Sequence, residues 1–359
     1  MTRGSVFHMY LPKTTHAWVH KGTPCFDKPF GELLELKERP LPRLTPGSAL
    51  IEVEGAPVNP SDMMFIRGQY GMKPQAGDIP GFEGCGTVLA ANAGPYGWWL
   101  KGQRVSFGAQ DGNGAWTRYA VVSIFSCIPV SRSLPVETAA TLIVNPMTAI
   151  GLIAKARKHG TKAIVVNAAG SALGRYLFAI ARWSGIEFIG LVRHAESANA
   201  LREMGAKHIL VTSEGDFIER FQNLSQQLDA RVLLDAVAGD ETALLMNAMP
   251  DRTLAIVYGQ LSQGGGDGAR SVRRVALDSD GLVFRKQRIE GYWLTHELHG
   301  FNGVFTPLLR ARQISKLYQK GILATGPIAA TSLKDLIPTM DQGVRDSKIV
   351  FLSEGLSYR

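Results

Sequence analysis

The clearest pattern of apolar and polar positions lies between residues 162 and 193. Residues 163–166, AIVV, form a short apolar run of the kind found in strands that are buried on both faces. Small residues follow, and apolar side chains then recur with helical spacing at Leu173, Leu177, Ile180 and Ala181. Gly185 ends this helix, and residues 187–192 predict a second strand. The pattern therefore predicts a strand–helix–strand unit with a tight first turn.

Strands and helices continue to alternate after this unit. Helices are predicted at about 196–204, 215–228 and 241–249, and strands at 208–211, 232–236, 254–258 and 289–294. Two helical segments, 135–140 and 144–156, precede the unit. Six strands with helical crossovers predict a doubly wound parallel sheet of the Rossmann type, to which we assign residues 131–298. The glycine-rich segment 264–268, between the last two strands, is expected to be a mobile loop.

The first 130 residues show a different, β-rich pattern. Short apolar segments between Gly- and Pro-bearing loops predict strands at 49–54, 84–90, 104–107 and 116–122. The tail from about residue 299 predicts a long helix, a Pro/Gly break at 326–327, a shorter helix and a closing strand at 348–352. Because a lone strand needs a sheet to join, we expect this strand to complete the first domain. That domain is then discontinuous and comprises residues 1–130 and 299–359.

Composition and charge exclude several classes of protein. The chain has 359 residues, a net charge of +8 and 45% hydrophobic residues. No apolar run reaches the ~18 residues of a membrane-spanning helix, and the first residues lack the apolar core of a signal peptide. No RNA motif or helix-turn-helix pattern accompanies the basic cluster of Arg270, Arg273, Arg274, Arg285, Lys286 and Arg288. We therefore expect a small-molecule substrate, and neither nucleic acid nor a membrane as a partner.

The cysteines point to a reducing environment. Cys25, Cys85 and Cys127 lie far apart, and the chain contains no C-x-x-C motif. This spacing indicates neither a zinc knot nor a disulfide framework. We therefore expect a cytoplasmic location, as the simplest reducing compartment.

The first turn of the strand–helix–strand unit carries candidate chemistry. Residues 168–172 and Gly174 are small, which lets a backbone approach a pyrophosphate placed at the N-terminus of the following helix. The G-x-G-x-x-G fingerprint itself fails, because Ala169 and Ser171 stand at its first two glycine positions. The turn therefore indicates either a dinucleotide site or an ordinary turn of an α/β protein.

The residue after the second strand bears on the choice of dinucleotide. Sites that select NAD usually have an acidic residue there, which accepts a hydrogen bond from the ribose 2′-hydroxyl. This chain has Arg193, followed by His194. A cation suits a 2′-phosphate, so Arg193 favours NADPH; the alternative is a solvated surface arginine.

Further segments carry a resemblance that extends along nearly the whole chain. They are VNPSD at 58–62, IRGQYG at 66–71, PGFEGCGTV at 80–88, KGQRV at 101–105, VNPMTA at 144–149, LGRYLFAIARWSG at 173–185, REMGAKHIL at 202–210 and LDAVAG at 234–239. Together these segments resemble the medium-chain dehydrogenase/reductase superfamily. The resemblance implies an α/β protein in which a GroES-like β-rich catalytic domain is joined to a Rossmann nucleotide-binding domain.

The resemblance also points to a branch of that superfamily. Its zinc alcohol dehydrogenases bind the catalytic metal with a cysteine, a His-Glu pair and a second cysteine. Here Asn59 stands at the first cysteine and Phe82 at the histidine, only Glu83 of the pair remains, and Val144-Asn145 occupy the region of the second cysteine. Since Phe and Asn cannot replace imidazole and thiolate on Zn²⁺, we expect no metal. The chain resembles the zinc-independent quinone oxidoreductases and 2-enoyl thioester reductases. Four segments look closest to the mitochondrial-type enoyl thioester reductases: NPSD, I-x-G-x-Y-G, VNP-x-TA and FRKQRIEGYWL at 284–294.

The resemblance assigns roles to individual residues. It implies that Tyr70 sits by the nicotinamide and assists reduction, that Asn59 lies beside the nicotinamide, and that Trp116 lines the substrate channel. NADPH is expected to contact Asn59, Thr148, Ala169, Gly170, Ser171, Ala172, Leu173, Gly174, Arg193, Tyr258, Gly259 and Phe284. From the residues alone, the favoured interpretation of Tyr70 is a loop tyrosine packed at the domain interface, and the sequence context of Asn59 also supports a turn residue before Pro60.

These roles predict a reaction class. Reduction of an activated C=C bond needs hydride delivery, stabilisation of the developing enolate and a proton, and the Tyr70 phenol can either donate to the enolate oxygen or supply the proton. We expect an NADPH-dependent reductase of a 2-enoyl thioester or a quinone. A cofactor-binding protein of the same fold without catalysis is the alternative, favoured by the degenerate turn. The apolar strand 289–294 is expected to be a sheet edge through which two copies form a homodimer.

Overall fold

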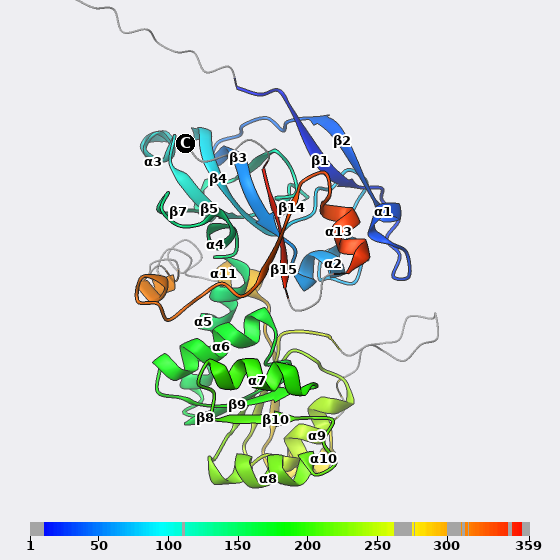
Figure 1. Cartoon of the computed structure of the whole chain (residues 1–359), viewed down its shortest axis with the longest axis vertical. Coiled ribbons are helices and arrows are strands. Elements are labelled where there is room, and N and C mark those ends of the chain that lie inside the picture. The colour runs from blue at the N-terminus through cyan, green and yellow to red at the C-terminus, as the bar shows by residue number, and fades with distance from the viewer. Residues whose placement is uncertain are drawn as a thin grey trace, which may run out of the picture. The chain divides into compact units, whose positions relative to one another are not determined.

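The chain folds into two compact units, shown in Figure 1, a cartoon of the computed structural model. The structure describes residues 11–109, 112–261, 275, 277–299, 310, 313–314, 316–343 and 347–353. Unit 1 comprises Met1–Val144 and Thr325–Arg359, and unit 2 comprises Asn145–Ala324. The expected glycine-rich loop at 264–268, the arginines Arg270, Arg273 and Arg274, and most of the predicted long helix after 299 lie outside the described residues.

The unit boundaries differ from the expected positions at 130/131 and 298/299. Helix α4, Val136–Ala140, was assigned to the second domain, but it contacts strands β3, β4, β5 and β15 of unit 1. Its alanines Ala139 and Ala140 are fully buried there. The first boundary therefore falls after Val144, because α4 buries its apolar face on the sheet of unit 1.

Unit 1 is built on a seven-stranded sheet with the order β14-β15-β3-β4-β5-β7, in which β6 also pairs with β3. The strands are β3 Ser48–Pro57, β4 Glu83–Asn92, β5 Arg104–Gly108, β6 Tyr119–Ser123, β7 Cys127–Pro129, β14 Ile328–Ser332 and β15 Lys348–Leu352. Strand β15 runs antiparallel to β3, with Val350 opposite Pro57. The tail strand predicted from the sequence thus joins the N-terminal sheet, as expected.

Shorter elements cover this sheet. Strands β1 Thr14–His20 and β2 Leu34–Pro40 form a separate antiparallel pair. The helices are α1 Phe30–Leu33, α2 Pro60–Ile66, α3 Gly94–Leu100, a 3-10 helix at Ile124–Ser126, α4, and α13 Leu336–Gln342. The main core of the unit includes Ile51, Val53, Ile66, Phe107, Trp116 and Phe351. Asp341 of α13 accepts hydrogen bonds from the backbone N–H groups of Phe30 and Gly31, which ties the tail to α1.

Unit 2 is a doubly wound parallel sheet with the strand order β10-β9-β8-β11-β12-β13. The strands are β8 Ala163–Val166, β9 Glu187–Val192, β10 His208–Val211, β11 Val232–Asp235, β12 Leu254–Val257 and β13 Arg288–Gly291. All six predicted strands are confirmed, although β13 is shorter than predicted and ends before Tyr292. The order reverses between β8 and β11, and ligands of such sheets bind outside the carboxyl ends of the strands at that point.

Helices connect the strands of unit 2. They are α5 Val144–Lys158, α6 Ala172–Trp183, α7 Ala195–Glu203, α8 Phe217–Gln227, α9 Asp240–Ala248, α10 Ser279–Val283 and α11 Leu294–His299. One side of the sheet packs in a core that includes Leu191, Phe221, Leu233, Met246 and Ala255. Among the described residues, no helix combines the length and the apolar character needed to cross a membrane.

A buried carboxylate fixes the start of α2 against the start of β4. Asp62 is fully buried and accepts hydrogen bonds from the backbone N–H of Asn59 at 2.7 Å and of Phe82 at 2.9 Å. Burial raises the pKa of Asp62 to about 7, and the two backbone bonds oppose that rise. The two segments that carry Asn59 and Glu83 are therefore held together by one side chain.

Asp62 makes the stability of the protein depend on pH. Its carboxyl holds a proton more tightly in the folded protein than in the unfolded chain, where its pKa is about 3.9. The stabilisation is therefore fully present below pH ~4 and is lost as the pH rises through ~7. We expect the free energy of unfolding of the wild type to fall by up to roughly 4 kcal/mol relative to Asp62→Asn over this range. Chemical denaturation across the pH series measures this difference.

The matched control is Asp341→Asn, since Asp341 also accepts two backbone N–H bonds but at an exposed position. Asp341→Asn measures the effect on stability of changing a carboxylate that accepts two backbone N–H bonds but is not buried. Parallel pH profiles for the wild type and Asp62→Asn would contradict the prediction.

Candidate active site

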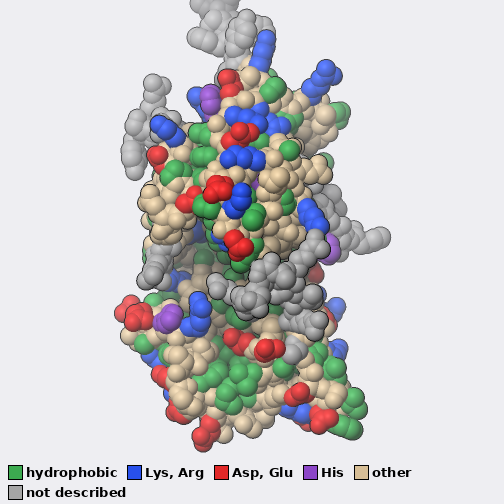
Figure 2. Space-filling model, turned by 90° about the vertical axis from the view of Figure 1, so that its right-hand side faces the viewer, with side chains coloured by type: hydrophobic (Ala, Val, Ile, Leu, Met, Phe, Trp, Pro, Cys, Tyr) green, Lys and Arg blue, Asp and Glu red, His purple; other side chains and the backbone are tan. Residues whose placement is uncertain are grey.

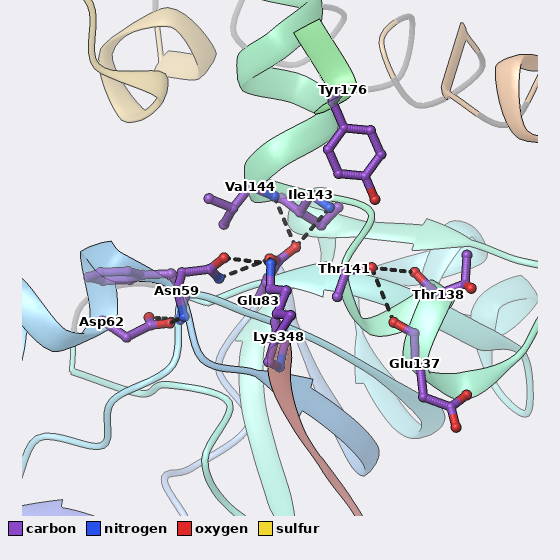
Figure 3. Close-up of polar contacts among 12 residues, drawn as sticks. Asn59, Asp62, Glu83, Glu137, Thr138, Thr141, Ile143, Val144, Tyr176 and Lys348 are labelled. Atoms are coloured by element: carbon purple, nitrogen blue, oxygen red, sulfur yellow. Dashed lines mark hydrogen bonds and ion pairs between the residues drawn. The ribbon is translucent and has the colours of Figure 1, made fainter. Parts of the chain in front are cut away.

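Glu83 is the centre of a polar network inside unit 1, shown in Figure 3. It is the first residue of β4 and is fully buried. One carboxylate oxygen, Oε2, accepts hydrogen bonds from the backbone N–H groups of Ile143 and Val144, each at 2.9 Å. The other, Oε1, accepts from Asn59 Nδ2 at 2.9 Å and lies 3.8 Å from Lys348 Nζ. Each oxygen therefore faces two donors, which satisfies the buried charge.

Asn59 is held on both ends of its amide. It caps the N-terminus of α2, where Pro60 supplies the first helical residue. Its Nδ2 donates to Glu83, and its Oδ1 accepts from Lys348 Nζ at 2.7 Å. Asn59 was expected to be either a turn residue or a cofactor contact, and in the structure it is a helix cap whose amide orientation is set by two charged partners.

Lys348 is a site residue that the sequence analysis missed. It comes from β15, and its side chain is only 12% exposed. Burial lowers the pKa of the Lys348 ammonium, and the nearby carboxylates of Glu83 and Asp62 oppose that shift. Because Lys348 and Asn59 are far apart in sequence, no local pattern could have paired them; a lone basic residue opening an apolar strand was the available signal.

Tyr70 lies against the aromatic side chain that stands at the histidine position of the zinc enzymes. The rings of Tyr70 and Phe82 have centroids 5.0 Å apart, and Phe65 meets Phe82 edge-on at 5.6 Å. Tyr70 is partly buried on the core of unit 1. Since Phe82 directly precedes Glu83, the structure brings Tyr70 into the same neighbourhood as the Glu83–Asn59–Lys348 network.

Trp116 packs in the interior of unit 1. Its side chain is fully buried, and its indole N–H donates to the backbone carbonyl of Pro57 at 3.0 Å. A Cβ atom added at Gly81 would lie 2.5 Å from the Trp116 ring, so the backbone packs directly on the indole. Trp116 is thus a core side chain of unit 1, and its expected place along a substrate channel stays a prediction.

The predicted phosphate turn joins β8 to α6 in unit 2. Ala168 has a φ of +48°, a left-handed conformation that costs energy for any residue with a side chain. A Cβ atom at Gly174 would overlap the backbone of Ala169, so only glycine lets α6 pack this closely on the turn. The close approach that a dinucleotide turn needs is therefore present although the first two glycines of the fingerprint are missing.

The same turn can receive an anion. Ser171 caps α6, and its hydroxyl oxygen accepts from the N–H of Gly174 at 3.1 Å, which leaves the hydroxyl hydrogen available to donate. Within the described part of the chain, the backbone N–H groups of Gly170, Ala172 and Leu173 donate no hydrogen bond. Free amides at the N-terminus of a 12-residue helix form an anion-binding site. The residues present therefore fit a phosphate.

Arg193 lies exposed at the carboxyl end of β9, next to the turn. Arg193 is close enough to Glu241 to affect its pKa. Burial raises the pKa of Glu241, whereas a hydrogen bond from Asn167 and the positive charge of Arg193 lower it. Arg193 thus shares the carboxyl edge of the sheet with the phosphate turn, which is the position at which a 2′-phosphate would be recognised.

A second buried carboxylate, at the end of β11, organises this edge, and the sequence analysis missed its role. Asp235 is fully buried and accepts from Asn167 Nδ2 at 2.7 Å and from Thr242 Oγ1 at 2.5 Å. It also accepts from the backbone N–H groups of Val237 and Ala238. Asn167 in turn accepts from the N–H of Ala236. These bonds join the carboxyl ends of β8 and β11 at the point where the strand order reverses.

Of the remaining predicted cofactor residues, Tyr258 and Gly259 lie at the carboxyl edge of the sheet. They follow β12 and donate their N–H groups to the carbonyl of Asp235. The Tyr258 hydroxyl is buried and has no hydrogen-bond partner among the described residues. Thr148 is a buried residue of α5.

Phe284 does not lie with the other cofactor residues. It is 77% exposed and follows α10. The next residue, Arg285, accepts from the N–H of Arg252 at 2.7 Å, which places this segment just before the amino ends of β12 and β13. Phe284 is therefore at the opposite edge of the sheet from the phosphate turn, because α10 leads the chain back to the start of the next parallel strand.

Each unit offers distinct chemistry. Unit 2 offers amides, a hydroxyl and a guanidinium for phosphate groups. Unit 1 offers a phenol, an oriented amide and a buried ammonium, which can donate to a developing negative charge. In the part of the chain that the structure describes, no group of three or more His, Cys, Asp or Glu side chains is arranged to hold a metal ion.

Comparisons with known protein sequences agree with this architecture. Residues 45–132 match the family model of the alcohol dehydrogenase GroES-like domain. The mitochondrial enoyl-[acyl-carrier-protein] reductase of Bos taurus is 28% identical over 282 residues, which span 77% of this chain and 71% of the bovine protein.

Solved structures are similar over almost the whole chain. A protein from Mesorhizobium loti, assigned as an NADPH:quinone reductase, is 30% identical, with a TM-score of 0.85 over 96% of this chain and 100% of that protein. The Etr1p/Etr2p heterodimer of mitochondrial 2-enoyl thioester reductase from Candida tropicalis and the complex of Etr1p with NADP and crotonyl-CoA are each 20% identical with a TM-score of 0.76. Both cover 94% of this chain and 99% of theirs. The chain therefore belongs to the medium-chain dehydrogenase/reductase superfamily, which these comparisons identify together with the two-unit fold.

Proposed function

We propose that this protein is an NADPH-dependent reductase of an activated C=C bond or a quinone. The single observation that carries the proposal is the phosphate turn of unit 2, where three free amides and the Ser171 hydroxyl stand beside Arg193. The names of the relatives support the same reaction class: they are enoyl-[acyl-carrier-protein] reductases and NADPH:quinone reductases.

The residues of unit 2 would hold the nucleotide by its phosphates. The amides of Gly170, Ala172 and Leu173 donate to the pyrophosphate, and Ser171 adds a hydroxyl donor. Arg193 pairs with the 2′-phosphate. Bound NADPH would supply the hydride, and the task of this chain is to orient it and to exclude water.

The residues of unit 1 would act on the developing charge of the substrate. Tyr70 is the proposed proton or hydrogen-bond donor to the carbonyl oxygen. Asn59 is the proposed contact to the nicotinamide, since Glu83 and Lys348 hold its amide in one orientation. The positive charge of Lys348 compensates Glu83, so the unit does not present an unpaired buried carboxylate to a forming enolate.

We propose a 2-enoyl thioester as the first substrate class to test and a quinone as the second. The enoyl class is favoured by the curated sequence relatives and by the place of Tyr70 next to Phe82. The quinone class is favoured by the Mesorhizobium loti protein. NADPH consumption with crotonyl-CoA and with a benzoquinone distinguishes the two, and no turnover with either would leave a cofactor-binding protein as the function.

The expected cytoplasmic location stays a prediction. It is supported by the three free cysteines, of which Cys85 and Cys127 are buried. The curated relatives are mitochondrial proteins, and the mitochondrial matrix is the alternative location because it would also keep the three thiols reduced.

Arg193 is expected to select NADPH over NADH. Arg193→Ala should weaken NADPH binding about five- to thirtyfold and leave NADH binding nearly unchanged, because only the 2′-phosphate loses a charged partner. Fluorescence titration of both nucleotides measures the two affinities. Arg231→Ala is the matched control, since Arg231 precedes β11 and lies at the opposite edge of the same sheet. Equal wild-type affinities for NADPH and NADH would overturn the assignment.

Tyr70 is expected to matter more for one substrate class than for the other. Tyr70→Phe removes one hydroxyl and should lower turnover of an enoyl thioester ~10²–10³-fold, because a donor to the enolate is lost. NADPH affinity should barely change. A quinone, which is easier to reduce, should show a small defect.

The control for Tyr70→Phe is Tyr119→Phe, which removes a hydroxyl from β6 of the same unit. Initial rates with both substrates and a nucleotide titration complete the experiment. Wild-type turnover of the enoyl thioester by Tyr70→Phe would make Tyr70 a packing residue only.

We also propose a homodimer through the outer edge of β13, which is one of the two edge strands that the described residues of the unit 2 sheet show. The Gly291 position is open, since a Cβ atom there meets nothing within 4 Å. Gly291→Asp should therefore leave the subunit folded but place two carboxylates close together across a paired edge, and shift sedimentation from dimer to monomer. Gly215→Asp, at another open position, should leave the dimer intact. A monomeric wild type at micromolar concentration would refute this prediction.

A further inference from the structure

Unit 1 exposes an unusual number of aromatic side chains around α3. Trp98 is 83% exposed, Trp99 54% and Tyr96 36%, and Phe125 of the neighbouring 3-10 helix is 57% exposed. Tyr96 and Trp99 stack with ring centroids 5.8 Å apart. Side chains of this size normally contribute a large apolar area to a core or an interface. We call these four residues, with the exposed cations Arg43, Lys101 and Arg132, the basic aromatic patch.

Hydrogen bonds show that the members of the patch lie together. The turn before β3 joins α3 and the 3-10 helix, because Gly47 donates to Asn92 and accepts from Ile124. Arg132 donates from Nη2 to the carbonyl of Gly102, next to Lys101, at 2.9 Å. Cys127 is close enough to Tyr96 to contribute to the rise in the pKa of Tyr96, which is due first to burial.

The charge of the patch has one sign. Residues 41–51, 88–103 and 120–136 contain Arg43, Lys101, Arg132 and no Asp or Glu. The face of unit 1 turned away from α3 is different: Figure 2 shows blue and red side chains intermixed there. On β2, for example, Glu35, Lys37, Glu38 and Arg39 place acidic and basic side chains next to one another. The basic aromatic patch is therefore a local feature, and its complement is an anionic surface.

We propose that the basic aromatic patch binds an anionic lipid surface. Tryptophan and tyrosine side chains favour the interface between headgroups and acyl chains, where the ring is dry and the polar atom is wet. Lysine and arginine beside them are attracted to anionic headgroups. A peripheral contact inserts only the ends of the aromatic side chains. It therefore does not need a membrane-spanning helix, and none is found among the described residues. The proposal revises the expectation that no membrane is a partner.

The make-up of the patch favours lipid over a protein partner. Four aromatic side chains at these exposures present roughly 400–500 Å² of surface on two short helices of seven and three residues. A peripheral membrane contact combines a few such inserted side chains with several cations.

Vesicle co-sedimentation tests the proposal with the full chain. Vesicles of phosphatidylcholine with about one third phosphatidylglycerol should bind the protein, and pure phosphatidylcholine should bind it much less. The double variant Trp98→Ala/Trp99→Ala should lower the partition coefficient at least tenfold. Lys101→Glu should lower it about tenfold on the anionic vesicles only. Circular dichroism and NADPH binding check that each variant is folded.

Two variants serve as matched controls. Trp183→Ala removes a tryptophan that is 46% exposed on α6 of unit 2, and Lys207→Glu reverses an exposed charge of the same unit. Both should bind vesicles as the wild type does. The proposal is overturned if the wild type does not bind anionic vesicles at low salt, or if the patch variants bind as well as the wild type. It is also overturned if the Trp98/Trp99 variant instead abolishes self-association, which would make the patch a contact between copies.

Discussion

The carboxylate of Glu83 is the constraint on which the catalytic half of the molecule depends. It joins Asn59 at the start of α2, the backbone of Ile143 and Val144 at the start of α5, and Lys348 from the tail. A charge this deeply buried is stable only when donors surround it, and loss of one donor costs more than the bond alone is worth. Three segments that are distant in sequence are therefore fixed relative to one carboxylate, and Asn59 receives its orientation from the same set of bonds.

The network also gives a physical account of a change within the superfamily. By the resemblance described above, the zinc enzymes share Glu83 with this chain but have a cysteine and a histidine, which bind their metal, at the positions of Asn59 and Phe82. Here the positive charge near Glu83 is an ammonium, that of Lys348. Phe82 turns its ring toward Tyr70 and Phe65, so an apolar aromatic cluster stands where an imidazole would bind a metal. The same carboxylate can thus be kept while its partner changes from a metal to a side chain.

Much of the fold could be predicted from the sequence because its signals are local. Three elements were predicted from a pattern within their own residues, and all three are confirmed. They are the strand at 163–166, the helix that begins near Leu173 and the closing strand at 348–352. Contacts between distant residues leave no such trace, which is why Lys348 and the Asp235–Asn167 pair were missed. Phe284 was expected at the cofactor because its segment resembles that of the enoyl reductases. Its position in the fold depends instead on α10, which leads the chain to the amino end of the next strand.

The return of the tail to the first sheet has a consequence for how the protein is made. Strand β3 pairs through Pro57 with Val350, and all of unit 2 is synthesised between these two residues. Unit 2 is one continuous segment and can fold as soon as it has emerged from the ribosome. Unit 1 must wait with residues 55–57 of β3 and the acceptors around Glu83 without their tail partners, for about 10–40 s at ordinary rates of translation. During that interval the nascent chain exposes an open stretch of strand edge, which is closed once β15, Lys348–Leu352, has been made.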